Sequence, residues 1–201
     1  MATKPLMFFF LRMITISLLI TSQATSPKLH TTFSRSLRPS ALGLELAATT
    51  KQKLTHLHFY FHDTVTSTHP TALLVAKPAS NTTVPASSFG YVFMADDPLT
   101  VGPKLSSKKV GRAQGMYASA AMETLGLLMA FNFVFTEGVY NGSYVSLFGR
   151  NAVFSGVREM PIVGGSGLFR FATGFAKAKT YSVDLETGNA VVEYNVYVLH
   201  Y

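Results

Sequence analysis

The chain has 201 residues, a formal net charge of +7 and no cysteine. This length allows one or two domains, and the absence of cysteine excludes disulfides, thiol nucleophiles and thiolate metal ligands. The basic residues form no run of five or six, which argues against a nucleic-acid partner, whereas the mild positive charge suits adhesion to an acidic polysaccharide.

The first 24 residues have the pattern of a secretory signal peptide. A basic start at Lys4 precedes a long apolar run and a small-x-small end at Ser22 and Ala24, after which we expect cleavage. Cleavage removes Lys4 and Arg12 and no acidic residue, so the net charge falls from +7 to +5. Arg12 interrupts the apolar run, and no later segment is long and apolar enough to span a membrane. We therefore expect a soluble protein that is secreted to the extracellular space and has no membrane partner.

The next residues divide into an arm and a β domain. Residues 25–53 are rich in Ser, Thr, Pro and basic residues without a clean period, which indicates a mobile arm or a removable leader. Residues 54–201 predict one domain in which turn signals separate strand-like segments. Strands are expected at 56–64, 71–76, 88–95, 110–120, 125–136, 143–149, 168–183 and 188–200.

Eight strands of similar spacing predict an all-β fold, either an antiparallel barrel or a sandwich. We favour the eight-stranded antiparallel β-barrel, because closure removes the exposed strand edges that a secreted protein would otherwise carry. The interior of such a barrel is just wide enough for side chains or for one small ligand in a central pocket.

The segment LHFYFHDT places an acid on the apolar face of a strand. Leu57, Phe59, Phe61 and Asp63 alternate along one face. A carboxylate among aromatic side chains loses hydration, which raises its pKa and allows proton transfer near neutral pH. A strand-end residue that binds its own turn at Thr64 is the alternative.

The segment DDPLT follows an aromatic strand, and we expect Pro98 to end that strand because proline cannot donate to the ladder. We expect Asp96 to point inward and Asp97 outward, with a turn cap before Pro98 as the alternative. Further along, REMPIVGGSGLFR has three glycines in four positions, which indicates positive φ values or close backbone approach. No helix pattern follows these glycines, so they do not form a phosphate loop.

Two sequons, at Asn81 and Asn141, predict N-glycosylation of a secreted protein. Of the six histidines, His58 and His62 share a strand face. At ~3.4 Å per residue they are too far apart to bind one metal ion on a straight strand. We expect no metal site.

Six segments together resemble the plant dirigent protein family. They are FYFHD, DDPLT, VGRAQGMY, YNGS, GRN and REMPIVGGSGLFRFATGFA, and they occur in the family's order. The closing VEYNVYVLHY and the lack of cysteine are similar to the cysteine-free branch, distinct from the best-known lignan-forming branch. The resemblance implies an eight-stranded barrel with its own pocket, located in the apoplast and assembled as a homo-oligomer, a trimer or alternatively a dimer.

The resemblance implies two alternative functions. Typical members impose stereoselectivity on the coupling of phenoxy radicals of monolignols such as coniferyl alcohol in lignan biosynthesis, and a separate laccase or peroxidase supplies the radicals. Some relatives are enzymes that remove water from an isoflavanol and close a pterocarpan ring through a quinone methide. We expect the first function, with phenolic small molecules as ligands and no cofactor. A phenolic carrier or a cell-wall structural protein is a third hypothesis.

The resemblance also implies the roles of particular residues. The implied catalytic residues are Asp63, Asp96 and Arg158, and the implied substrate-binding residues are Tyr117, Asn151, Phe61 and Phe93. The two aspartates would transfer protons around a quinone methide, and Arg158 would stabilise an oxyanion. A surface ion pair of Arg158 with Glu159 is the alternative.

Tyr117 and Asn151 carry separate expectations. Tyr117 would bind and stack a phenol, or would alternatively be an ordinary core tyrosine. Lignan-forming members have an aspartate at the position of Asn151. An amide cannot act as a base at neutral pH, so this departure weakens the lignan prediction.

Overall fold

The computed structural model describes residues 52–201. The predicted signal peptide (1–24) lies outside the described residues, as does the predicted arm (25–53) except for its last two residues. The described part contains nine strands and two short 3-10 helices. They are β1 (Lys53–Asp63), β2 (Ala72–Ala76), β3 (Val92–Thr100), β4 (Lys109–Ser119), β5 (Gly126–Phe135), η2 (Gly138–Tyr140), β6 (Tyr144–Ala152), β7 (Arg158–Ser166), η3 (Gly167–Phe169), β8 (Thr173–Val183) and β9 (Ala190–His200). No helix within 52–201 is long and apolar enough to cross a membrane.

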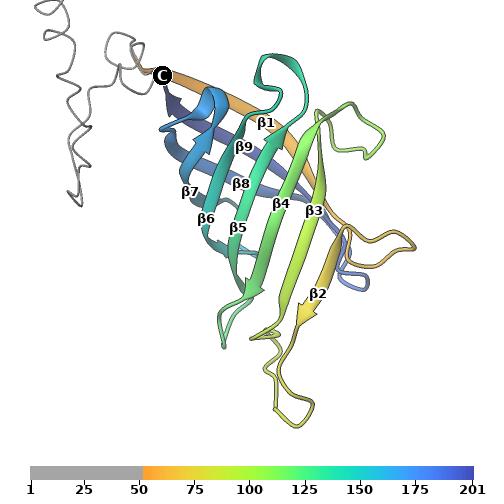
Figure 1. Ribbon diagram of the computed structural model, residues 1–201. Coiled ribbons are helices and arrows are strands. Elements are labelled where there is room, and N and C mark those ends of the chain that lie inside the picture. The colour runs from red at the N-terminus through yellow and green to blue at the C-terminus, as the bar shows by residue number, and fades with distance from the viewer. Residues whose placement is uncertain (1–51) are drawn as a thin grey trace, which may run out of the picture.

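All nine strands belong to one antiparallel sheet that closes on itself. The order is β1-β9-β8-β7-β6-β5-β4-β3-β2, and an additional pairing between β1 and β3 completes the ring (Figure 1). β1 and β9 pair along their whole lengths, from Lys53↔His200 to Asp63↔Ala190. The structure confirms the predicted all-β fold and its closed eight-stranded barrel, to which β2 adds one extra strand.

Strand β3 changes its neighbour partway along its length. Its first part pairs with β2 up to Ala95, whereas Leu99 and Thr100 pair with β1. Residues 96–98 lie at this fork, and neither β1 nor β2 supplies a ladder partner for them. The expectation that Pro98 ends the strand is therefore wrong, because the missing N–H of Pro98 lies where no ladder hydrogen bond is required.

The sequence predictions miss β7 and misplace the start of β8. Pro161 and the glycine cluster of β7 indicate turns rather than a strand, yet β7 pairs with both β6 and β8. Its ladder with β6 runs from Ser166 to Ile162 and does not include the adjacent Pro161, which cannot donate a hydrogen bond. The predicted strand 168–183 is wrong over its first residues, because η3 and a φ of 61° at Phe171 separate β7 from β8.

The barrel interior is apolar towards one end and polar towards the other. Buried rings pack the apolar part, with centroids 5.1–6.3 Å apart, from Phe59, Phe133, Phe135, Phe169 and Tyr194. Asp63 ends β1, Arg158 begins β7 and Asn151 lies near the end of β6. Since neighbouring strands are antiparallel, these three residues lie at the same end of the barrel.

Candidate active site

Asp63 faces the lumen at the end of β1. It follows the buried Phe59 and Phe61 at alternate positions and is itself half-buried. The Tyr117 hydroxyl, from β4, donates to Asp63 Oδ1 over 3.4 Å. Burial raises the pKa of Asp63 to about 6, and the hydrogen bond from Tyr117 opposes the rise. Asp63 is therefore ionised at neutral pH but basic enough to accept a proton.

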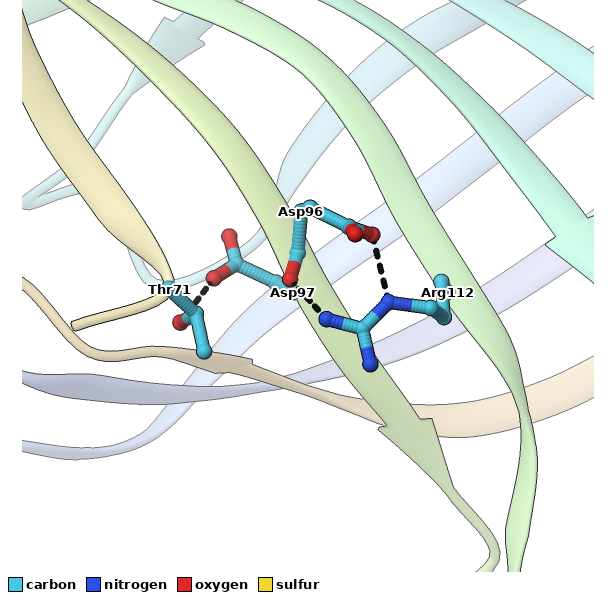
Figure 2. Close-up of polar contacts among 4 residues, drawn as sticks. All are labelled: Thr71, Asp96, Asp97 and Arg112. Atoms are coloured by element: carbon cyan, nitrogen blue, oxygen red, sulfur yellow. Dashed lines mark hydrogen bonds and ion pairs between the residues drawn. The ribbon is translucent and has the colours of Figure 1, made fainter. Parts of the chain in front are cut away.

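The buried aspartate of β3 is Asp97, and the expected inward orientation of Asp96 is wrong. Asp97 is fully buried, whereas Asp96 is exposed and pairs with Arg112 on the outside of the barrel (Figure 2). The pairing of β3 with β4 is regular from Phe93 through Asp97. Alternation with Phe93 and the buried Ala95 therefore turns Asp97 inward and Asp96 outward.

Asp97 has one satisfied carboxyl oxygen and one unsatisfied oxygen. The Thr71 hydroxyl donates to Oδ1 (Figure 2), whereas Oδ2 is buried and has no hydrogen-bond partner among residues 52–201. Burial, reinforced by the charge of Asp63, raises the pKa of Asp97 to about 8, although Thr71 and Arg112 oppose the rise. At neutral pH Asp97 is thus a buried carboxylic acid that can donate a proton.

The two carboxyl groups form a coupled acid–base pair. Their pKa values are separated, about 6 for Asp63 and about 8 for Asp97, and the charge of Asp63 disfavours ionisation of Asp97. At pH 7 the pair therefore holds one proton, on Asp97, and one negative charge, on Asp63. Opposite protonation states at neighbouring carboxyls are the arrangement that general acid and base catalysis requires.

Arg158 supplies a buried positive charge from β7. Its Nε donates to Asn151 Oδ1 and its Nη1 donates to Thr180 Oγ1, each over 3.0 Å. The side chain is only 4% exposed, which rules out the alternative of a surface ion pair with Glu159. No carboxylate in the described part of the chain pairs with it, and burial lowers the pKa of Arg158. A guanidinium held by neutral groups can stabilise an anionic oxygen on a ligand.

Asn151 fixes the orientation of this guanidinium. It is buried on β6, where its Oδ1 accepts from Arg158 and its Nδ2 lies 3.6 Å from Met129 Sδ. An aspartate at this place would neutralise the arginine. The amide preserves the positive charge of the site.

Aromatic side chains surround the acid–base pair. Tyr117 stacks on Phe93 at 5.0 Å between centroids and faces Phe131 at 6.4 Å, and Phe61 meets Phe131 edge-on at 5.7 Å. Planar rings of this kind match a phenolic ligand in shape and polarity. The structure thus brings together six of the seven implied site residues and replaces Asp96 with Asp97.

A cavity of about 380 Å³ opens at the polar end of the barrel. Asp63 contributes to its wall together with residues of the β3–β4 and β8–β9 connections, including Pro103, Leu105, Asp184 and Asn189. This volume lies in the range of small-molecule sites. The cavity therefore gives a small ligand access to Asp63, whereas Asp97, Tyr117 and Arg158 are not part of its wall.

Sequence reasoning missed Thr71 and Thr180, the partners of Asp97 and Arg158. Both are threonines in segments without a motif, and only the closed barrel brings them to the site. Asp97, in contrast, was detectable from its shared parity with Phe93. Among residues 52–201, no group of three or more His, Cys, Asp or Glu side chains could hold a metal ion. The two sequon asparagines, Asn81 and Asn141, are exposed in loops.

The fold and the site together define a β-barrel protein whose lumen carries an acid–base pair, a buried arginine and aromatic walls. The family described as Dirigent-like protein matches residues 54–199. The chain belongs to the dirigent family.

Comparisons with individual proteins also support membership of the dirigent family. Dirigent protein 21 of Arabidopsis thaliana is 58% identical over 149 residues, which cover 74% of this chain and 78% of that protein. Pterocarpan synthase 1 of Glycyrrhiza echinata is 49% identical over 173 residues, covering 85% and 88%. The solved pterocarpan synthase dirigent protein GePTS1 superimposes with a TM-score of 0.70 at 50% identity, covering 76% of this chain and 87% of its own. For PsPTS1 the TM-score is 0.69 at 51% identity, covering 74% and 96%.

Proposed function

We propose that this protein is an acid–base catalyst that removes water from a phenolic alcohol in the barrel lumen and closes a ring through a quinone methide. The observation that carries this proposal is the pair of inward carboxyls, Asp97 protonated and Asp63 ionised at neutral pH. The similarity to proteins named pterocarpan synthase, at 49–51% identity, supports an isoflavanol as the substrate.

The proposed reaction begins with loss of water. Asp97 gives the proton on Oδ2 to the hydroxyl on the carbon next to the phenol ring, and the C–O bond breaks as water leaves. Asp63 accepts the proton of the phenol hydroxyl, so that a neutral quinone methide forms. Arg158 stabilises the negative charge that develops on the phenol oxygen.

Ring closure then restores both acids. A second phenol hydroxyl attacks the quinone methide carbon and forms the new C–O bond, and its proton passes to Asp97. Asp63 returns its proton to the quinone methide oxygen, which becomes a phenol again. The net change is loss of one water molecule, without an oxidant or a reductant.

Guided coupling of phenoxy radicals is the second candidate function. It is supported by the proteins named dirigent protein in Arabidopsis thaliana, which are 55–58% identical to this chain. In this case a separate laccase or peroxidase would generate the radicals of a monolignol, and the lumen would orient them. Each ~1.4 kcal/mol between competing transition states gives about tenfold selectivity, which a shaped lumen can supply.

A pair of assays distinguishes the two functions. The protein is offered an isoflavanol with free phenol hydroxyls and no oxidant, and separately coniferyl alcohol with a laccase. Formation of the cyclised product, lost in Asp97→Asn, is expected in the first assay. An enantiomeric excess of coupled product in the second assay alone would overturn the proposal in favour of guided coupling. If neither assay gives product, the third hypothesis, a phenolic carrier, is favoured.

We further propose that the protein acts in the apoplast as a glycosylated homo-oligomer. The exposed positions of Asn81 and Asn141 support glycosylation. An apolar band on the outside of the barrel supports self-association, because its side chains lie side by side across β2 to β6 in direct register. The band consists of Leu73, Met94, Met116, Ala130 and Phe148.

A further inference from the structure

Thr71 occupies a fixed position between the β1–β2 connection and Asp97. Its main-chain N–H donates to the Thr64 carbonyl over 2.8 Å, and the Thr64 N–H donates back to Thr71 Oγ1 over 3.2 Å. The Thr71 carbonyl in turn accepts from the Asp96 N–H over 2.9 Å. These three bonds tie Thr71 to Thr64, directly after β1, and to β3 at the fork where the barrel closes, which holds its hydroxyl beside Asp97.

The bonding of the Thr71 hydroxyl assigns the two oxygens of Asp97. A hydroxyl has one hydrogen to donate. Its oxygen already accepts from the Thr64 N–H, and the hydroxyl donates to Asp97 Oδ1, the bond drawn as a dashed line in Figure 2. Oδ1 is therefore the accepting oxygen, and a proton on Asp97 is left with Oδ2. Oδ2 is the buried atom that lacks a partner throughout residues 52–201.

We propose that Thr71 is a positioning residue that selects Oδ2 of Asp97 as the proton-carrying oxygen. The inference rests on the proposed function for its catalytic meaning, since Asp97 is the acid of that reaction. The geometric assignment itself is independent of the substrate. Thr71 contacts no reacting atom and acts through Asp97.

Several charged and titratable groups also act on Asp97. They are Asp63 on β1, Asp96 on β3, Arg112 and Tyr117 on β4, and Tyr194 on β9. The two aspartates disfavour ionisation of Asp97 and Arg112 favours it. Removal of the Thr71 hydroxyl changes none of these charges, so a change in the titration of Asp97 after that substitution reports the hydrogen bond alone.

The titration of Asp97 tests the assignment directly. Proteins labelled with ¹³C at aspartate Cγ are titrated by NMR as wild type, Thr71→Val and Thr71→Ser, and Asp97→Asn identifies the signal. Thr71→Val removes a donor to the ionised form, so the Asp97 titration should move upward by roughly one pH unit. Thr71→Ser keeps the hydroxyl and should titrate as the wild type. If Thr71→Val does not fold, Thr71→Ala takes its place.

Turnover of the isoflavanol in the same variants gives the second readout. Thr71→Val should lower kcat about tenfold with little change in KM, because the proton is no longer confined to one oxygen, and Thr71→Ser should restore it. An unchanged Asp97 titration in Thr71→Val, or a Thr71→Ser protein that behaves like Thr71→Val, would overturn the inference. A wild-type protein without turnover would defeat the proposed function but leave the NMR result to decide the role of Thr71.

Discussion

Asp63 and Asp97 are the same residue type with different roles, and their surroundings make the difference. Asp63 is half-buried beside the cavity and accepts from a tyrosine, whereas Asp97 is sealed at the β-strand fork with one oxygen unpartnered. Burial raises the pKa of both carboxyl groups, and the charge of Asp63 raises the pKa of Asp97 further. One carboxyl therefore keeps its proton at a pH where the other has lost it.

These pKa values predict a bell-shaped pH dependence of kcat/KM. Activity should rise as Asp63 ionises through its pKa of about 6 and fall as Asp97 loses its proton through its pKa of about 8. Asp63→Asn should lower the rate by at least about 10²-fold while leaving the melting temperature nearly unchanged. A flat profile between pH 5 and pH 9, or a variant that merely unfolds, would contradict the catalytic role of Asp63.

Burial of Asp97 also predicts a pH-dependent stability. Its folded-state pKa, about 8, lies above the value of an unfolded aspartate. The native state therefore binds the extra proton, and the free energy of unfolding falls as pH rises between those two values, by about 1.4 kcal/mol per pH unit from this group. Urea unfolding at pH 5 and pH 7 should show this slope in the wild type and lose most of it in Asp97→Asn. Equal slopes would argue against a protonated Asp97.

Asn151→Asp tests the free positive charge of Arg158. The new carboxylate would lie within hydrogen-bond distance of the guanidinium and neutralise it. We expect turnover of the isoflavanol to fall about tenfold, because the phenol oxygen loses its cationic partner, while Asn151→Gln serves as the uncharged control. The same variant, assayed with coniferyl alcohol and laccase, shows whether an acid at this position favours radical coupling. Full activity of Asn151→Asp would remove Arg158 from the mechanism.

At the scale of the strands, alternation predicts most of the architecture. In strands β1, β4, β5 and β9, buried positions alternate with more exposed ones over much of their length, and in β1 and β5 several of the buried positions carry aromatic rings. The same reasoning does not predict β7, because Pro161 and the glycines of this strand are residue types typical of turns. A shift of one residue along β3 decides whether Asp96 or Asp97 faces the lumen. Pro98, directly after Asp97, makes this register hard to predict from the sequence.

Strands β4 and β5 approach each other so closely at Gly115 that a side chain does not fit there. A Cβ at Gly115 would lie 2.1 Å from the carbonyl oxygen of Ala130, so the two strands would have to separate. Gly115→Ala should lower the free energy of unfolding by about 2–3 kcal/mol. The matched control is Gly156→Ala, where a Cβ would meet nothing within 4 Å. Equal stability of the two variants in urea would show that β4 and β5 tolerate the added methyl group.

At the scale of the whole molecule, the apolar band predicts assembly. Met94 and Met116 are paired directly across β3 and β4 and remain 50% and 36% exposed. A charge in the centre of such a surface disfavours its burial against another copy. Met116→Asp should therefore shift the protein to monomers in sedimentation velocity experiments. Val139→Asp, in the exposed 3-10 helix η2 of the same barrel, should not.

Within residues 52–201, the packed rings close one end of the barrel, so a ligand of the lumen would enter and leave at the other end. With Phe59, Phe133 and Phe169 packed against their neighbours, nothing can pass straight through the cylinder. A product molecule would have to leave past Asp63 before the next substrate molecule could enter. Product and substrate should then exclude each other, so added product ought to raise the apparent KM and leave the maximal rate untouched.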